Sequence, residues 1–186
     1  MIILPDIRNF TGRSSVVALG TFDGLHMGHR ALIYRAVALA EEKHATALVF
    51  TFSEHPLSVL DPSAALAPLL SAEQRRKLFR KMGVKTLVEQ PFNAEFASLS
   101  PKEFCLLIKY CLRPAVVIAG YNYSFGHGGI GDAALLSKLG DELGFNVEII
   151  PQVSLDGVAV SSTIIRSLLA AGRTDEAARM MSGREL

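Results

Sequence analysis

The amino-acid sequence predicts an α/β protein built on an open parallel sheet with helices on both faces. Short runs of β-branched and apolar residues alternate along the 186 residues with segments whose apolar side chains recur at helical spacing. Strands and helices that alternate in this way form βαβ units, whose strands are parallel. A chain of this length fits one domain of ordinary size, so we expect residues 1–186 to form a single domain with a Rossmann-like fold.

The first half of the chain begins with a strand at Ser15–Gly20, where continuous apolar character indicates burial on both faces. A helix is expected over about Gly28–Lys43, because alanine and leucine recur there at helical spacing. Ala45–Phe52 is expected to be a second strand. Asp61–Pro68 contains two prolines and small residues, which favour a loop. Ser71–Met82 opens on Ser-Ala-Glu-Gln, which suits a helix N-cap, and Gly83 follows as a stop signal.

The second half continues the alternation. Val84–Glu89 is expected to be a third strand, and a further helix opens at Ser100, with proline at its first position. Pro114–Ala119 is expected to be a fourth strand. Asp132–Leu143 is a helix that ends at a glycine, and Asn146–Pro151 is the fifth strand.

Composition and charge bear on the class of protein. Apolar residues make up 49% and charged residues 20% of the chain, which is typical of a globular protein with a core. The formal net charge of +1 gives no electrostatic reason to expect nucleic acid or an anionic membrane as a partner. Apolar runs such as Pro114–Ala119 are far shorter than a membrane span, and no secretory signal is evident. We therefore expect a cytoplasmic protein that is monomeric or weakly oligomeric.

The segment Gly20–His29 follows the first predicted strand and leads directly into a helix. In open α/β sheets ligands bind beyond the carboxyl ends of the strands, so this turn is placed to contact a ligand. Its glycines permit a tight turn, and His26 and His29 share one face of the helix start. Both histidines then lie beside the positive end of the helix dipole, where a phosphate would bind. The alternative is that these residues only shape the turn, but the His-x-Gly-His set favours phosphate binding.

A second segment with the same capacity lies near the end of the chain. A helix is expected from Ser161 or Ser162 to Ala171, before a last short helix at Thr174–Met181. Free backbone N–H groups and hydroxyls converge at the first of these helix starts, and Arg166 lies one turn on, where it can reach the same anion. Alone, the segment favours an ordinary N-cap with an exposed arginine. Beside the first segment it favours binding of the β- and γ-phosphates of a nucleotide.

These motifs resemble those of a known family. The decamer Gly20–His29, G-T-F-D-G-L-H-M-G-H, is similar to the signature of the FMN adenylyltransferase module of bacterial FAD synthetases, which is usually fused to a riboflavin kinase. The H-x-G-H core is shared across the nucleotidyltransferase superfamily, and the Phe-Asp-Gly extension narrows the match to this module. Further blocks that resemble the family, in order along the chain, are Thr51–Pro56, Ser71–Gly83, Pro91-Phe92, Phe96–Phe104, Gly120–Gly126, Gly131-Asp132 and Ser161–Arg166.

The resemblance implies a nucleotidyltransferase-type fold and an enzyme that transfers AMP from ATP to FMN, giving FAD and pyrophosphate. It implies catalytic roles for His26, His29 and Arg166. The residues implied to bind ATP are Gly20, Phe22, Asp23, Gly24, His26, His29, Ser162, Thr163 and Arg166. Those implied to bind FMN are Phe52, His55, Pro56, Asn122, Tyr123 and Phe125, whose aromatic members offer flat surfaces to the isoalloxazine ring. Mg²⁺ is expected to arrive with ATP, and no metal site made of protein ligands can be read from the sequence.

Some residues keep open roles. Asp23 would repel a triphosphate unless its carboxylate binds a cation, orients a histidine, or contacts a sugar or an amide donor. Asn122 follows the fourth predicted strand, where its amide suits a heterocycle edge or a phosphate, but an asparagine near glycines also suits a turn. Glu54 and Ile164 stand where the family often has proline and arginine, so the way flavin and phosphate are held is open. His44 and His127 are expected at the surface without a ligand role.

The chain ends at Gly183–Leu186, about where the fused kinase would begin, so we expect the kinase module to be absent. The sequence does not decide between a stand-alone enzyme and a piece of a longer one. Two alternatives to FMN adenylylation remain, namely nucleotidyl transfer to another phosphorylated acceptor and a non-catalytic flavin- or nucleotide-binding module. The joint presence of both histidines, Asp23 and Arg166 argues against the non-catalytic module, because binding alone would not demand the full set.

Overall fold

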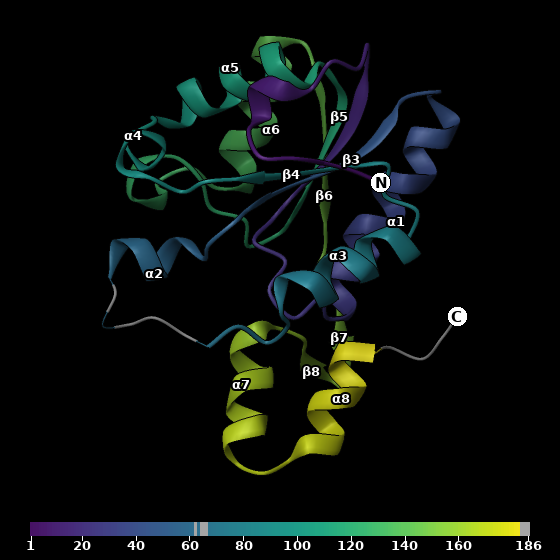
Figure 1. Ribbon diagram of the computed structural model, residues 1–186, viewed down its shortest axis with the longest axis vertical. Coiled ribbons are helices and arrows are strands. Elements are labelled where there is room, and N and C mark those ends of the chain that lie inside the picture. The colour runs from purple at the N-terminus through teal and green to yellow at the C-terminus, as the bar shows by residue number, and fades with distance from the viewer. Residues whose placement is uncertain (62, 64–66, 183–186) are drawn as a thin grey trace.

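The computed structural model of the chain describes residues 1–61, 63 and 67–182, so the loop predicted at Asp61–Pro68 lies partly outside the described residues. The main sheet has six parallel strands in the order β1-β4-β3-β2-β5-β6 (Figure 1). Helices pack against both faces of this sheet. The predicted α/β class, with an open parallel sheet covered on both sides, is therefore confirmed.

The strands of the sheet are β1 (Ile2–Leu4), β2 (Ser15–Leu19), β3 (Thr46–Phe52), β4 (Thr86–Gln90), β5 (Pro114–Gly120) and β6 (Asn146–Ile150). All except β1 were predicted to within two residues at each end. β1 was missed because three residues at the sheet edge, two of them exposed, carry no periodic signal. A two-stranded hairpin of β7 (Ser154–Leu155) and β8 (Val158–Ala159) was missed for the same reason.

Helices α1 (Met27–Glu42) and α3 (Ala72–Lys81) cover one face of the sheet, and α5 (Pro101–Leu112) and α6 (Ala133–Leu143) cover the other (Figure 1). α3 and α5 begin at the predicted starts, Ser71 and Ser100, and each start is a capping box. α7 (Ser162–Ala170) and α8 (Thr174–Ser182) pack against each other in a smaller cluster at one end of the molecule. Single-turn elements that were not predicted are η1 (Ile7–Asn9), α2 (Pro56–Leu60), α4 (Ala94–Ala97) and η3 (His127–Gly129).

The central strands are buried on both faces. Leu48 and Phe50 of β3 pack into the core on the α5 side, while Ala47 and Val49 alternate with them into the core on the α1 side. Every residue of β2 is buried, which confirms the expectation from its continuous apolar run. On one side of β2 the sheet continues with β3 and β4, and on the other side it continues with β5 and β6, so the strand order reverses between β2 and β5. The carboxyl ends of β2 and β5 therefore flank the topological switch point, where such sheets bind ligands.

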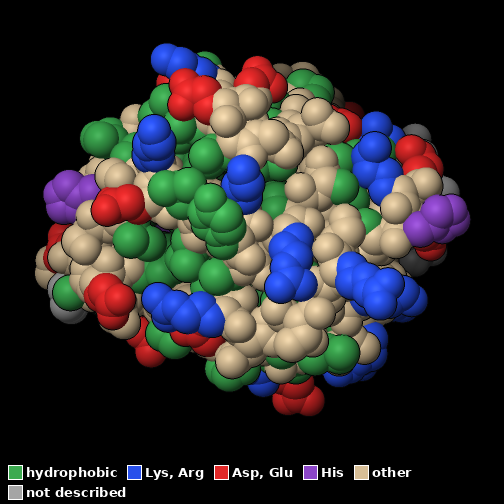
Figure 2. Space-filling view, turned by 90° about the horizontal axis from the view of Figure 1, so that it is seen from above, with side chains coloured by type: hydrophobic (Ala, Val, Ile, Leu, Met, Phe, Trp, Pro, Cys, Tyr) green, Lys and Arg blue, Asp and Glu red, His purple; other side chains and the backbone are tan. Residues whose placement is uncertain are grey.

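The surface and the helices can be set against what a membrane-bound or highly charged protein would show. Figure 2 shows one face of the molecule, on which basic and acidic side chains are interspersed among apolar ones. No helix within the described part of the chain combines the length and the apolar character that a membrane crossing requires.

Packing of α1 on the sheet is expected to contribute strongly to stability. Ile33 is a fully buried residue of α1, so Ile33→Ala should lower the free energy of unfolding by about 2–5 kcal/mol. The matched control is Tyr34→Ala, because Tyr34 is 53% exposed on the same helix and should change stability by no more than about 0.5 kcal/mol. Urea denaturation of both variants measures the difference, and equal midpoints would contradict this description of the core.

Candidate active site

The turn between β2 and α1 has an unusual backbone. The backbone φ angles of Phe22, Gly24 and Leu25 are 50°, 81° and 43°. They lie in the left-handed region, which residues other than glycine rarely adopt. At Gly24 a Cβ atom would also lie 2.7 Å from Cδ1 of Leu69. Phe22 and Leu25 are fully buried, so their packing offsets a backbone cost of about 1–3 kcal/mol each. The turn is held in one conformation by its own apolar side chains.

His26 and His29 lie against each other at the start of α1. Nδ1 of His26 accepts a hydrogen bond from the backbone N–H of His29 at 3.4 Å and thereby caps the helix. The two rings stack with centroids 3.7 Å apart, and the ring of Phe22 meets His29 edge-on at 5.2 Å. Within the described residues, Nδ1 of His29 is buried without a hydrogen-bond partner. The expected placement of both histidines on one side of the helix start is observed.

The environment keeps both imidazoles neutral at physiological pH. Burial lowers the pKa of His26 to about 4, although the carboxylate of Asp23 raises it. Burial, together with the neighbouring His26, also holds the pKa of His29 well below its ordinary value. In the ligand-free protein the rings are therefore N–H donors and dipoles rather than cations.

The histidines line a polar cavity of about 300 Å³, here called the histidine pocket. It lies between the carboxyl ends of the central strands and the starts of α1 and α7, so two helix N-termini face it. The predicted ATP-binding residues that line it are Gly20, His26, His29, Ser162 and Thr163. Asn122 also lines the histidine pocket, although the resemblance had implied a place on the FMN side.

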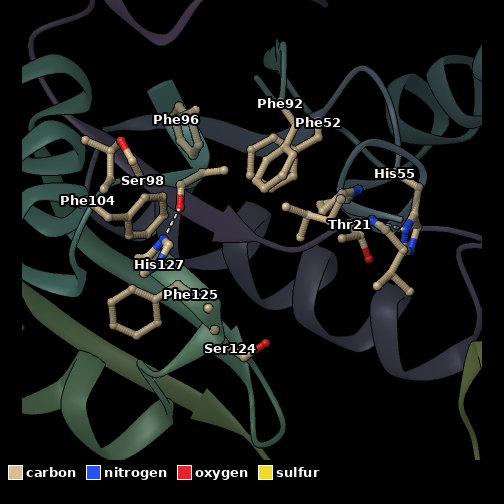
Figure 3. Close-up of a pocket in the computed structure, with 18 of the residues that line it drawn as sticks. Thr21, Phe52, His55, Phe92, Phe96, Ser98, Phe104, Ser124, Phe125 and His127 are labelled. Carbon is tan, nitrogen blue, oxygen red and sulfur yellow. Dashed lines mark hydrogen bonds between the residues drawn. The ribbon is translucent and has the colours of Figure 1, made fainter. Parts of the chain in front are cut away.

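A larger cavity of about 740 Å³, here called the aromatic pocket, opens on the other side of the β2 turn. Six phenylalanine rings line it, from β3, α4, the start of α5 and two loops: Phe50, Phe52, Phe92, Phe96, Phe104 and Phe125. All of them except Phe50 are labelled in Figure 3. The predicted FMN-binding residues Phe52, His55, Pro56, Tyr123 and Phe125 all line this pocket. Its volume lies in the range of cavities that bind drug-sized ligands.

Sequence reasoning missed part of the aromatic pocket. Phe92 and Phe96 stand in blocks that resemble the family, but both were given no site role, and Phe96 lies in the unpredicted helix α4. Their rings meet Phe52 edge-on at 5.0 and 5.3 Å. His127 is exposed as expected, yet it lines the pocket, with Nδ1 3.2 Å from the carbonyl oxygen of Ala97. Aromatic residues at loop ends carry no periodic signal that separates pocket walls from core.

A third cavity of about 340 Å³, here called the arginine pocket, contains Arg75 and Arg166 together with Asp23 and His55. The carboxylate of Asp23 forms an ion pair with Arg166 and accepts a hydrogen bond from the backbone N–H of Leu69 at 3.0 Å. In the ligand-free protein the carboxylate of Asp23 thus has the guanidinium of Arg166 and a backbone amide as partners, and its role toward a ligand stays open. Among the cavities lined by described residues, Arg166 belongs to this one and not to the histidine pocket.

Thr21 lines all three pockets and marks the point where they meet. Its carbonyl oxygen accepts hydrogen bonds from Oγ1 of Thr51 at 3.0 Å and from Nη1 of Arg75 at 3.2 Å. The residue was overlooked because it fills a variable position of the decamer. Two predicted ATP-binding residues, Phe22 and Gly24, do not line any of these three pockets, and they act by shaping the turn.

Within residues 1–61, 63 and 67–182, no group of three or more histidine, cysteine, aspartate or glutamate side chains is placed to hold a metal ion.

The lowered pKa of His26 predicts a pH-dependent stability. Below pH 6.5 the unfolded chain takes up a proton at His26 that the folded chain does not, so acidification from pH 6.5 toward 4 favours unfolding. The free energy of unfolding should fall by about 2 kcal/mol between pH 7 and pH 5 on account of this residue. His26→Asn, which keeps a capping side chain, should flatten this dependence, whereas the exposed His44→Asn should not. Denaturation curves at pH 5, 6 and 7 give the free energy of unfolding of each protein as a function of pH. The same dependence on pH in the wild type and both variants would contradict the assignment.

Comparison with known proteins agrees with this geometry. Residues 9–164 match the family model for FAD synthetase. A bifunctional riboflavin kinase/FMN adenylyltransferase of Listeria monocytogenes is 33% identical over 92% of this chain and 55% of its own length. The protein of that description from Escherichia coli K12 is 32% identical over 83% of this chain and 50% of its own length. The chain thus spans about half the length of these curated relatives.

Two further matches extend the comparison. A protein of Listeria monocytogenes described as FAD synthetase is 27% identical over 93% of this chain and 70% of its own length. A crystal structure from Streptococcus pneumoniae, described as a macrolide-efflux protein, superposes with a TM-score of 0.84 and 30% identity, covering 97% of this chain and 60% of that one. The resemblance predicted from the motifs is confirmed, and the chain belongs to the FAD synthetase family.

Proposed function

We propose that this chain transfers AMP from ATP to FMN, forming FAD and releasing pyrophosphate. The observation that carries the proposal is the meeting, at Thr21, of an aromatic pocket large enough for a flavin with a polar pocket between two helix N-termini. The family membership supports it, since relatives that match most of this chain are described as FMN adenylyltransferases.

In the proposed reaction an oxygen of the FMN phosphate forms a bond to the α-phosphorus of ATP. The bond between that phosphorus and the oxygen bridging to the β-phosphate breaks, and pyrophosphate leaves with the electron pair. The aromatic and histidine pockets share Gly20, Thr21, Tyr123 and Ser124, so a flavin in the first can present its phosphate to a nucleotide in the second. Catalysis of this kind rests on positioning and charge stabilisation, without an enzyme nucleophile.

The neutral imidazoles of His26 and His29 donate hydrogen bonds to the phosphoryl group as charge develops on its oxygens. Their burial strengthens this effect, because fixed dipoles in a dry site need no reorganisation. Ser162 and Thr163, at the start of α7, hold the phosphate chain with backbone N–H groups and the helix dipole. Arg166 reaches the phosphate chain of ATP from the adjoining arginine pocket.

The remaining expectations belong to the same proposal. Mg²⁺ enters with ATP as part of the substrate, because it takes most of its ligands from phosphates and water, and Asp23 and Glu54 line the arginine pocket as carboxylates. Asn122 contacts the nucleotide or the attacking phosphate from the wall of the histidine pocket. The protein acts in the cytoplasm as a monomer or weak oligomer, without nucleic acid.

Incubation with ATP, FMN and Mg²⁺ is expected to yield FAD and pyrophosphate in equal amounts, measured by chromatography and a coupled pyrophosphate assay. His29→Asn shortens the side chain, withdraws the imidazole N–H from the phosphoryl group and should lower kcat/KM by about 10²–10³-fold. His44→Asn is the matched control, because His44 is exposed and lies outside the three pockets. It should keep full activity.

Failure can take two forms that favour different alternatives. FMN binding seen by calorimetry without turnover above the His29→Asn level would favour a non-catalytic flavin-binding module. Absence of FMN binding, together with AMP transfer to a different phosphorylated compound, would favour another acceptor.

A further inference from the structure

Helix α3 presents three arginines, and their environments differ. Arg76 forms two-pronged hydrogen bonds with the buried carboxylate of Glu89, including Nε to Oε2 at 2.9 Å. Arg80 is exposed outside the three pockets. Arg75 is part-buried, and within the described residues it has no ion pair and a single hydrogen bond, from Nη1 to the carbonyl oxygen of Thr21.

A part-buried guanidinium without a carboxylate partner is unfavourable in the ligand-free protein. Burial lowers the pKa of Arg75, and the carboxylates of Glu89 and Asp23 raise it only in part. Charged groups taken out of water are normally paired, because the lost hydration is otherwise uncompensated. Arg75 would therefore gain a partner if an anion entered the pocket that it lines.

The arginine pocket supplies the remaining parts of an anion site. Within the described residues, both hydrogen bonds of Arg166, to Asp23 and to the carbonyl oxygen of Ala67, come from Nη2, which leaves Nε and Nη1 for a ligand. Ser53, Ser58 and His55 add polar groups to the pocket wall. Burial lowers the pKa of His55; among the charges that act on this ring, Asp23 raises the pKa, and Arg166 and Arg75 lower it, so both guanidinium groups act on the same side chain of the pocket wall.

We propose that Arg75 joins Arg166 in binding the pyrophosphate that leaves ATP, in the arginine pocket that both side chains line. This inference rests on the proposed adenylyl transfer and adds a binding residue outside the two signature motifs. The step is the one already written, in which the α-phosphorus to bridging-oxygen bond breaks and the electron pair departs with the β- and γ-phosphates. Guanidinium groups suit those phosphates because they donate paired hydrogen bonds and keep their charge.

The in-line course of the reaction favours the leaving group over the FMN phosphate as the occupant. The aromatic pocket adjoins both of the others: it shares four lining residues with the histidine pocket and three, Thr21, Phe52 and His55, with the arginine pocket. A flavin phosphate that attacks a nucleotide in the histidine pocket leaves the arginine pocket open. The attacking and leaving oxygens of an in-line displacement lie on opposite sides of the phosphorus, so the leaving group needs a separate space. Asp23 and Glu54 in the same pocket suit an anion that carries Mg²⁺ rather than a bare phosphate monoester.

The test is calorimetric titration of the full chain with magnesium pyrophosphate and, separately, with FMN. Arg75→Ala should weaken the Kd for pyrophosphate by about 10-fold or more, the scale of one charged hydrogen-bonding contact. Arg80→Ala, which removes the same charge from the same helix, should leave that Kd within about twofold, because exposed charges outside the site act weakly. Arg75→Lys should give an intermediate value, and FMN affinity should stay unchanged in all three variants.

Two results would overturn the assignment. One is an unchanged pyrophosphate Kd in an Arg75→Ala protein whose thermal unfolding matches the wild type. The other is a loss of FMN affinity with riboflavin affinity retained, which would place the acceptor phosphate at Arg75. Either result alongside normal FAD formation by the wild type removes the role of Arg75 and leaves the proposed function intact. If the wild type forms no FAD while Arg75→Ala still weakens pyrophosphate binding, the proposed function is refuted and the anion site at Arg75 remains.

Discussion

The carboxylate of Asp23 joins three parts of the chain that are far apart in sequence. It pairs with Arg166 of α7 and accepts a hydrogen bond from the backbone N–H of Leu69. The backbone carbonyl oxygen of Asp23 accepts a further hydrogen bond from the hydroxyl of Ser162 at 2.9 Å. α7 and α8 form a small core of their own, so these bonds help fix where the start of α7 stands relative to α1. The spacing of the two helix N-termini around the histidine pocket depends on that connection. A carboxylate this deeply buried is tolerated because the guanidinium and the amide replace its lost hydration.

Charge is divided between neighbouring pockets in a way that suits phosphoryl transfer. The histidine pocket contains neutral, stacked imidazoles and helix N-termini, which stabilise developing negative charge without a fixed cation. Full positive charges stand in the arginine pocket, on Arg75 and Arg166. The aromatic pocket is largely apolar and offers ring faces instead of charge. Thr21 touches all three, at the switch point between β2 and β5, so the fold itself brings the proposed sites for a planar acceptor, a nucleotide and a leaving anion to one place.

Much of this arrangement could be predicted from the sequence, and the failures have physical causes. Long elements such as α1 and β3 carry clear periodicity, and capping residues such as Ser71 mark their ends. β1 and α4 are too short for a period, so neither appeared. The motifs correctly brought the histidines to the start of α7. They could not place Arg166, because its direction depends on the ion pair with Asp23, a contact across 143 residues. The rings of Phe92 and Phe96 were missed because pocket walls and core have the same composition.

The central claim is that adenylyl transfer takes place at Thr21, with the flavin, the nucleotide and the leaving anion in separate pockets. A crystal structure of the chain with FMN and an ATP analogue carrying a non-hydrolysable α,β-bridge tests it most directly. The isoalloxazine ring should lie among the phenylalanine rings, with an FMN phosphate oxygen about 3–3.5 Å from the α-phosphorus beside Thr21 and the histidines. The β- and γ-phosphates should extend toward Arg75 and Arg166. A flavin bound outside the aromatic pocket, or an α-phosphorus remote from Thr21, would contradict the account.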